Sequence, residues 1–172
     1  MNLLLYIIII AAIYSFIVFI LLRLVTPYTG FGKLPKPKQI PHEIIVKISE
    51  LETASSNSQE YLQKIYDFVT SRWHAGRFTT IFYAPLAFRT NLMKIWKSPG
   101  FAQCNTQNYI VFVMLTNSKF FKPEDIKLRT VFFNFFLHQY LKVKVGNEWI
   151  NVDPAGASIR GKPLGAYISI FG

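Results

Sequence analysis

The sequence predicts an α+β domain that is preceded by one transmembrane helix. A run of twenty uncharged residues, Leu3 to Leu22, opens the chain, helical periodicity recurs through residues 43–116, and strand-like patterns fill residues 126–152. Helices followed by strands are typical of the α+β class, in which helices pack against an antiparallel sheet. We therefore expect N-terminal helices, one of them buried in the core, to pack on such a sheet.

Residues 1–23 are predicted to form a transmembrane anchor. Twenty apolar residues in a helix rise about 30 Å, the thickness of a bilayer core, and a helix satisfies its own backbone hydrogen bonds there. A cleaved signal peptide would begin with basic residues and end at small ones. Here the run follows Met1-Asn2 and ends before Arg23. We therefore expect a single-pass membrane protein in contact with the lipid bilayer.

Basic residues predict the orientation and the kinds of partner. Those that follow the span are Arg23, Lys33, Lys36 and Lys38. Such an excess tends to stay cytoplasmic, which favours a cytoplasmic domain. The whole chain has 19 Lys and Arg against 9 Asp and Glu, a formal net charge of +10. That charge suits anionic headgroups, so a basic lipid-binding module is one reading. Without zinc-ligand spacing, a helix-turn-helix pattern or an RNA-binding aromatic signature, we expect no nucleic-acid partner.

Residues 24–42 are predicted to be a linker rich in proline and glycine. The prolines are Pro27, Pro35, Pro37 and Pro41. Proline fixes its own backbone angle and disfavours helix in the residue before it. We therefore expect an extended, semi-stiff spacer. The remaining residues, 43–172, are assigned to one domain.

The first half of that domain is predicted to be helical. Helices are expected over Glu43 to Thr53, from the N-cap residues at 55–58 to a stop at Gly76, and over Leu86 to Lys97. The segment from Phe78 to Tyr83 is strand-like or irregular. Cys104 then precedes a helix of about 13 residues that is apolar on all sides, and such a helix must be buried.

The second half is predicted to be an antiparallel sheet. Three strands are expected over Ile126 to Phe136, Leu137 to Val145 and Glu148 to Val152, and Ile168 to Phe171 would add a closing strand. Apolar and polar residues alternate in the second strand, as in a half-exposed sheet. Gly146-Asn147 is a turn signal.

A thiol, an imidazole and a carboxylate stand in order along the chain as Cys104, His138 and Asp153. The only cysteine cannot form an internal disulfide, so it serves packing or chemistry. The hairpin that turns at Gly146-Asn147 brings His138 nearly opposite Asp153. The carboxylate would orient the imidazole and stabilise its charged form. Each residue could also have a purely structural role. The cysteine could be buried for packing, the histidine could be structural, and the Asp-Pro pair could start a turn.

The proposed nucleophile is Cys104. The N-terminus of a helix favours an anion, and a nearby imidazolium adds to this effect, so both favour the reactive thiolate. The thiolate would attack a carbonyl to form a thioester, and His138 would act as general base and acid. Backbone N–H groups around Cys104, or the side chain of Gln103, would stabilise the oxyanion.

The stretch from Cys104 to Pro154 resembles the transglutaminase-like superfamily of papain-fold thiol enzymes. That family places its Cys at the start of a core helix and its His at the start of a strand, with an aromatic residue two positions later, here Tyr140. Its Asp lies in a Trp-x-x-x-Asp-Pro segment, matched by Trp149, Asp153 and Pro154. This chain departs from the family at Ala102, where Gly is common, and at Asn108, where a small residue is common.

The resemblance implies a cysteine hydrolase or acyltransferase with a Cys104–His138–Asp153 triad. A protein or peptide substrate is expected, and hydrolysis by a cysteine protease or amidase is favoured over crosslinking. No cofactor or metal is expected, because the 9 acidic residues form no calcium-binding cluster. The alternative is a catalytically inactive, membrane-tethered binding domain of the same fold.

Overall fold

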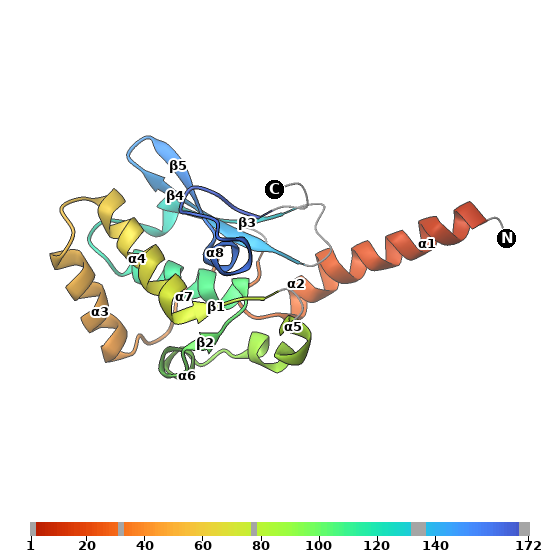
Figure 1. The fold of residues 1–172 in the computed structure, drawn as a ribbon, viewed down its shortest axis with the longest axis horizontal. Coiled ribbons are helices and arrows are strands. Elements are labelled where there is room, and N and C mark those ends of the chain that lie inside the picture. The colour runs from red at the N-terminus through yellow and green to blue at the C-terminus, as the bar shows by residue number, and fades with distance from the viewer. Residues whose placement is uncertain (1–2, 31–32, 77–78, 132–136, 169–172) are drawn as a thin grey trace.

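The computed structural model describes residues 3–30, 33–76, 79–131 and 137–168. Within these ranges the chain has an α+β architecture, in which helices pack against a three-stranded antiparallel sheet (Figure 1). The long N-terminal helix projects away from the other elements.

The prediction of a transmembrane helix is wrong. The predictions of a single-pass membrane protein and of a cytoplasmic domain, which depend on that helix, are wrong as well. The apolar run is divided into α1 (Leu3–Phe16), a π-helix (Ile17–Leu21) and α2 (Leu22–Val25). Because the π-helix interrupts the α-helical hydrogen bonding, α1 has only 14 residues. In the described part of the chain, no helix combines the length and hydropathy needed to cross a membrane.

The linker lies against the domain instead of acting as a free spacer. The side chain of Leu34 belongs to the hydrophobic core and is 9% exposed. Tyr28 stacks on Tyr109, with ring centroids 3.6 Å apart. Proline content did favour an extended backbone, but it carries no information about which side chains are buried.

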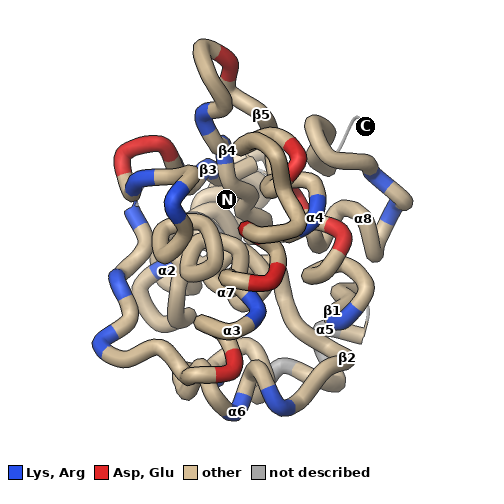
Figure 2. Tube along the Cα trace, turned by 90° about the vertical axis from the view of Figure 1, so that its left-hand side faces the viewer, with Lys and Arg blue, Asp and Glu red and all other residues tan. Residues whose placement is uncertain are grey.

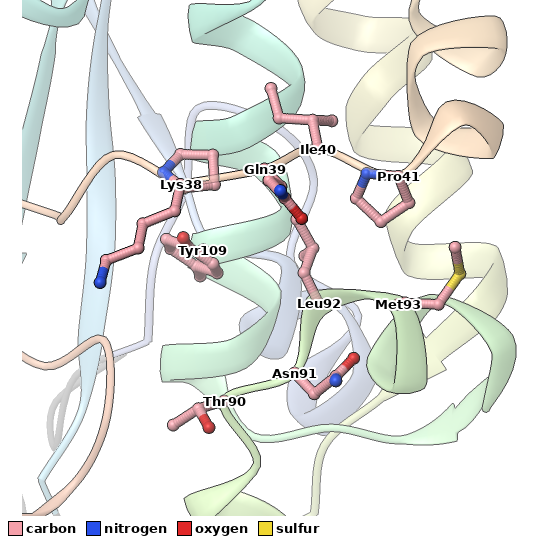
Figure 3. A pocket seen from close by; sticks show the side chains of 10 residues that line it. Lys38, Gln39, Ile40, Pro41, Thr90, Asn91, Leu92, Met93 and Tyr109 are labelled. Carbon is pink, nitrogen blue, oxygen red and sulfur yellow. The ribbon is translucent and has the colours of Figure 1, made fainter.

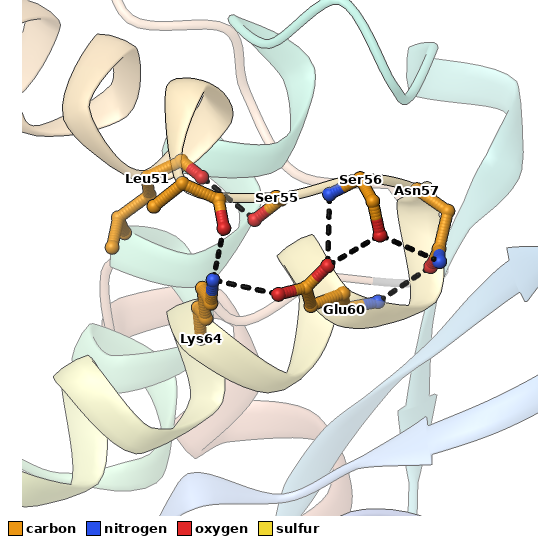
Figure 4. Close-up of polar contacts among 7 residues, drawn as sticks. Leu51, Ser55, Ser56, Asn57, Glu60 and Lys64 are labelled. Atoms are coloured by element: carbon orange, nitrogen blue, oxygen red, sulfur yellow. Dashed lines mark hydrogen bonds and ion pairs between the residues drawn. The ribbon is translucent and has the colours of Figure 1, made fainter.

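Two longer helices, α3 (His42–Thr53) and α4 (Ser58–Arg72), form one side of the molecule. Their connection is held by polar contacts around the N-cap residue Asn57 (Figure 4), whose side chain accepts from the N–H of Glu60 at 2.9 Å. The Glu60 carboxylate accepts from the N–H of Ser56 at 2.8 Å and pairs with Lys64 at 2.7 Å. These contacts satisfy backbone donors that a helix start leaves unpaired.

Short elements follow where one longer helix was expected. The strand β1 (Trp73–His74) ends α4 before Gly76, because it pairs in parallel with β2 (Gly100–Phe101). Between them lie α5 (Thr79–Phe82), a 3₁₀ helix (Ala84–Phe88) and α6 (Leu92–Lys97). The helix expected over residues 86–97 is therefore divided, and Asn91 caps its second part.

The sheet has the order β3-β4-β5, with β3 (Ile126–Thr130), β4 (Gln139–Val145) and β5 (Glu148–Val152). Leu141 pairs with Val152 across the β4–β5 hairpin, which turns at Gly146, where φ is 59°. A 3₁₀ helix (Pro123–Asp125) precedes β3, and α8 (Pro154–Arg160) follows β5. The ends expected for the first and the closing strands fall in 132–136 and 169–172, outside the described residues.

The helix α7 (Cys104–Thr116) occupies the centre of the fold. It packs against α4 on one side and β4 on the other. Eleven consecutive residues of α7, Asn105 to Leu115, are buried. This is the buried core helix that the all-round apolar sequence predicts.

Candidate active site

Cys104 is the first residue of α7, directly after the N-cap residue Gln103. Its side chain is partly accessible, whereas the next residues of the helix are buried. Gln103 makes no side-chain capping bond, so the first-turn N–H groups remain free of such a cap. A partly accessible thiol thus lies at the positive end of a buried helix dipole.

Polar side chains in the first turns of α7 bind the helix to its surroundings. Asn108 donates to the backbone oxygen of Gln139 at 2.7 Å, and Asn105 donates to the backbone oxygens of Pro27 at 2.8 Å and Ala87 at 3.1 Å. Because Gln139 directly follows His138, the Asn108 bond sets the spacing between the helix that carries the thiol and the strand that carries the imidazole.

His138 precedes β4 by one residue and continues its pairing. Its backbone oxygen accepts from the N–H of Val131 at 2.9 Å, and its side chain is 7% exposed. The Nε2 atom lies 2.8 Å from Oδ2 of Asp153, and the neighbouring Cys104 thiol is among the groups that raise the pKa of the ring. Since Asp153 occupies Nε2, Nδ1 is the ring nitrogen left for the thiol.

Asp153 is fully buried and is the N-cap of α8. Its Oδ1 atom accepts from the N–H of Gly156 at 3.0 Å. Its Oδ2 atom accepts from the N–H of Ile168 at 3.0 Å, in addition to its bond with His138. A buried carboxylate requires such partners. The three bonds hold the oxygen that faces the imidazole in one position.

Gly156 completes this corner of the site. A Cβ atom at this position would lie 2.7 Å from Oδ2 and 2.9 Å from Cγ of Asp153. A Cβ atom essentially never comes that close to an unbonded heavy atom, so a larger residue must displace the carboxylate. The absence of a side chain at Gly156 is therefore what allows Asp153 to reach His138.

The charge state of the imidazole follows from these neighbours. Burial lowers the pKa of His138, but the hydrogen bonds to Asp153 and Cys104 outweigh this effect and raise that pKa well above its ordinary value. Both neighbours therefore favour the charged form of the ring. A cation beside the thiol stabilises a thiolate, and Asp153 neutralises the ring from its other side.

A cavity of about 720 Å³ lies beside α7 (Figure 3). The linker residues 37–41 form one wall, the start of α6 forms the other, and Tyr109 lies between them. Tyr109 follows Cys104 by five residues, which is about 7.5 Å along the helix axis. The lining mixes apolar side chains with the amides of Gln39 and Asn91, a composition that suits a peptide-like ligand.

The structure thus brings the three predicted residues together. The other two histidines, His42 and His74, are exposed and lie at the start of α3 and in β1. Within the described ranges, no three His, Cys, Asp or Glu side chains gather as a metal site would require.

Sequence reasoning missed Asn108 and Gly156 as parts of this site. A signal for Asn108 was present, because an amide within a helix predicted to be buried must find a partner. The signal for Gly156 was weaker. An Asp-Pro pair at a helix start caps the N–H three residues later, so the residue at that position lies against the carboxylate.

Comparison with protein-family models, curated proteins and solved structures yields no match to this chain. The resemblance to the transglutaminase-like superfamily therefore stays a prediction from the residues.

Proposed function

We propose that the protein is a thiol enzyme that cleaves or transfers acyl groups of peptide or side-chain amides. One observation carries the proposal: the buried ring of His138 lies 2.8 Å from the Asp153 carboxylate, and Cys104, at the start of α7, is close enough to raise the pKa of the same ring. Such an arrangement pairs a nucleophile with a general acid and base and holds the ring with a third group. A packing cysteine has no need of a buried imidazolium beside it.

The reaction would proceed in two steps. The Cys104 thiolate attacks the amide carbonyl carbon, a C–S bond forms, and the backbone N–H groups at the start of α7 stabilise the oxyanion. When the C–N bond breaks, Nδ1 of His138 gives its proton to the leaving nitrogen. Water then attacks the thioester, its proton passes to Nδ1, and the thiolate departs to leave a carboxylic acid.

Hydrolysis is favoured over amine transfer. Water reaches any open thioester, whereas transfer to lysine requires a site that binds the acceptor chain. The resemblance of residues 104–154 to papain-fold thiol enzymes is consistent with this choice.

Alkylation of the single cysteine tests the proposal directly, because iodoacetamide modifies only Cys104 in a chain with one cysteine. An ordinary thiol has a pKa of about 8.5, so its alkylation slows about ten-fold for each unit of pH below that value. A Cys104 paired with the charged His138 is expected to react at a nearly constant rate from about pH 6 to about pH 8.

The His138→Ala variant should restore the steep pH dependence and react at least about ten-fold more slowly at about pH 6. His74→Ala, which removes an exposed histidine, is the matched control and should leave the rate unchanged. If Cys104 behaves as an ordinary thiol, or if its fast reaction is indifferent to His138, the enzyme proposal fails and the non-enzymatic binding domain replaces it.

A further inference from the structure

A second cavity, of about 500 Å³, lies between the linker, α7 and the start of β3. Its lining includes Phe112, which follows Cys104 by eight residues and is therefore about 12 Å further along the helix axis. This cavity is distinct from the candidate active site. Its volume falls within the range of small-molecule sites in proteins, about 300–1,000 Å³.

The floor of this cavity is apolar. Leu34, Phe112 and Ile126 line it, and they are only 9%, 4% and 8% exposed, because each also belongs to the hydrophobic core. They come from the linker, from α7 and from β3. Three separate elements thus form a preshaped apolar surface at the edge of the core, and an apolar group placed there would lose water without any rearrangement of the fold.

The rim of the cavity is cationic. Lys33, Lys36 and Lys127 line it against one carboxylate, Glu124, and all four are exposed. None of these four residues takes part in an ion pair with another residue in the described part of the chain. The Lys127 ammonium lies 4.1 Å from the centroid of the Trp149 ring. Over the whole chain 19 Lys and Arg stand against 9 Asp and Glu, and Figure 2 marks both kinds along the trace.

We propose that this cavity binds a small carboxylate with an apolar body, such as a medium-chain or aryl-substituted alkanoate. The apolar body packs on Phe112, Leu34 and Ile126, and the carboxylate accepts from the ammonium groups of Lys33 and Lys36. Binding of one anion would reduce the net positive charge of the rim without reversing its sign. The inference does not depend on the chemistry of Cys104, because none of the lining residues belongs to the candidate active site.

Calorimetric titration of the full chain with phenylbutyrate tests this site, and the uncharged phenylbutanol serves as the matched ligand. The carboxylate is expected to bind at least about ten-fold more tightly than the alcohol, a difference of about 1.4 kcal/mol.

The double variant Lys33→Ala/Lys36→Ala should weaken phenylbutyrate binding at least about ten-fold. Lys94→Ala/Lys144→Ala removes the same charge from exposed positions outside the cavity and should bind as the natural chain does. Equal affinity for the acid and the alcohol, or equal weakening in both double variants, would overturn the proposal. Either result would indicate adsorption to exposed apolar surface or general charge attraction, and neither would affect the alkylation of Cys104.

Discussion

At the scale of single residues, the site depends on side chains that the thiol chemistry does not itself require. Asp153 uses one oxygen to cap α8 and the other to hold both His138 and the N–H of Ile168. Gly156 leaves the space in which that carboxylate lies. Small errors in the position of reacting groups cost large factors in rate, so these supporting residues should be as sensitive as the three that carry the chemistry.

Gly156→Ala tests this sensitivity. The new Cβ would meet the carboxylate at 2.7 Å and push it away from His138. The charged form of the imidazole would then be less stable. Alkylation of Cys104 at about pH 6 should slow on the order of 10-fold or more. Ser158→Ala, at an exposed position of the same helix, is the control and should react at the natural rate. An unchanged rate in Gly156→Ala would show that the carboxylate does not govern the imidazole.

At the scale of elements, the order of helices and strands could be predicted from the sequence, but several boundaries could not. The burial of α7 could be predicted from its apolar composition. The β4–β5 hairpin could be predicted from the alternation of apolar and polar residues on either side of Gly146. The end of α4 could not be predicted, because it depends on the pairing of Trp73 with Gly100, a residue far away in the sequence. The division between α1 and α2 was hidden as well, since a π-helix has no sequence signal in a uniformly apolar run.

The carboxylate of Glu60, at the start of α4, predicts a dependence of the stability on pH. Hydrogen bonds from Lys64 and Ser56 lower the pKa of Glu60 to about 2, from an ordinary value of 4.5. A carboxylate with a lowered folded-state pKa stabilises the fold above its ordinary pKa, and this stabilisation is lost as the pH falls through the lowered value.

Thermal unfolding of Glu60→Gln should therefore differ from that of the natural chain near neutral pH, with a lower Tm, and the difference should disappear near pH 2. Glu124→Gln removes an exposed carboxylate that forms none of the observed ion pairs and should change Tm little at any pH. A Tm difference for Glu60→Gln that persisted unchanged at low pH would contradict this account.

At the scale of the whole molecule, the folded unit begins earlier than the sequence predicts. The stretch that reads as a proline-rich spacer contributes Leu34 to the core, stacks Tyr28 on Tyr109 and accepts hydrogen bonds from Asn105 and Gln139. Composition identified its extended backbone but not its contacts, which depend on residues far away in the chain. The predicted triad was easier to find, because two of its members are brought together by one short hairpin.

Leu34→Ala measures how far the linker is part of the domain. Removing a buried leucine side chain leaves a cavity and should lower the free energy of unfolding by about 2–3 kcal/mol in urea titrations. Leu24→Ala, in the exposed helix α2, is the control, because its side chain is 68% exposed, and it should change stability by less than about 0.5 kcal/mol. Equal stability of both variants would indicate that residues 24–42 act only as a spacer and do not stabilise the domain.

The double role of Asp153 has a consequence for how this protein can evolve. Selection at position 153 acts on the start of α8 as well as on the imidazole, so a descendant that had lost its chemistry would still be penalised for replacing the aspartate. Cys104 makes no backbone bond of that kind within the described hydrogen bonds and would be free to drift. Among relatives of this chain, retention of the cysteine would therefore distinguish an active lineage from an inactive one, and retention of the aspartate would not.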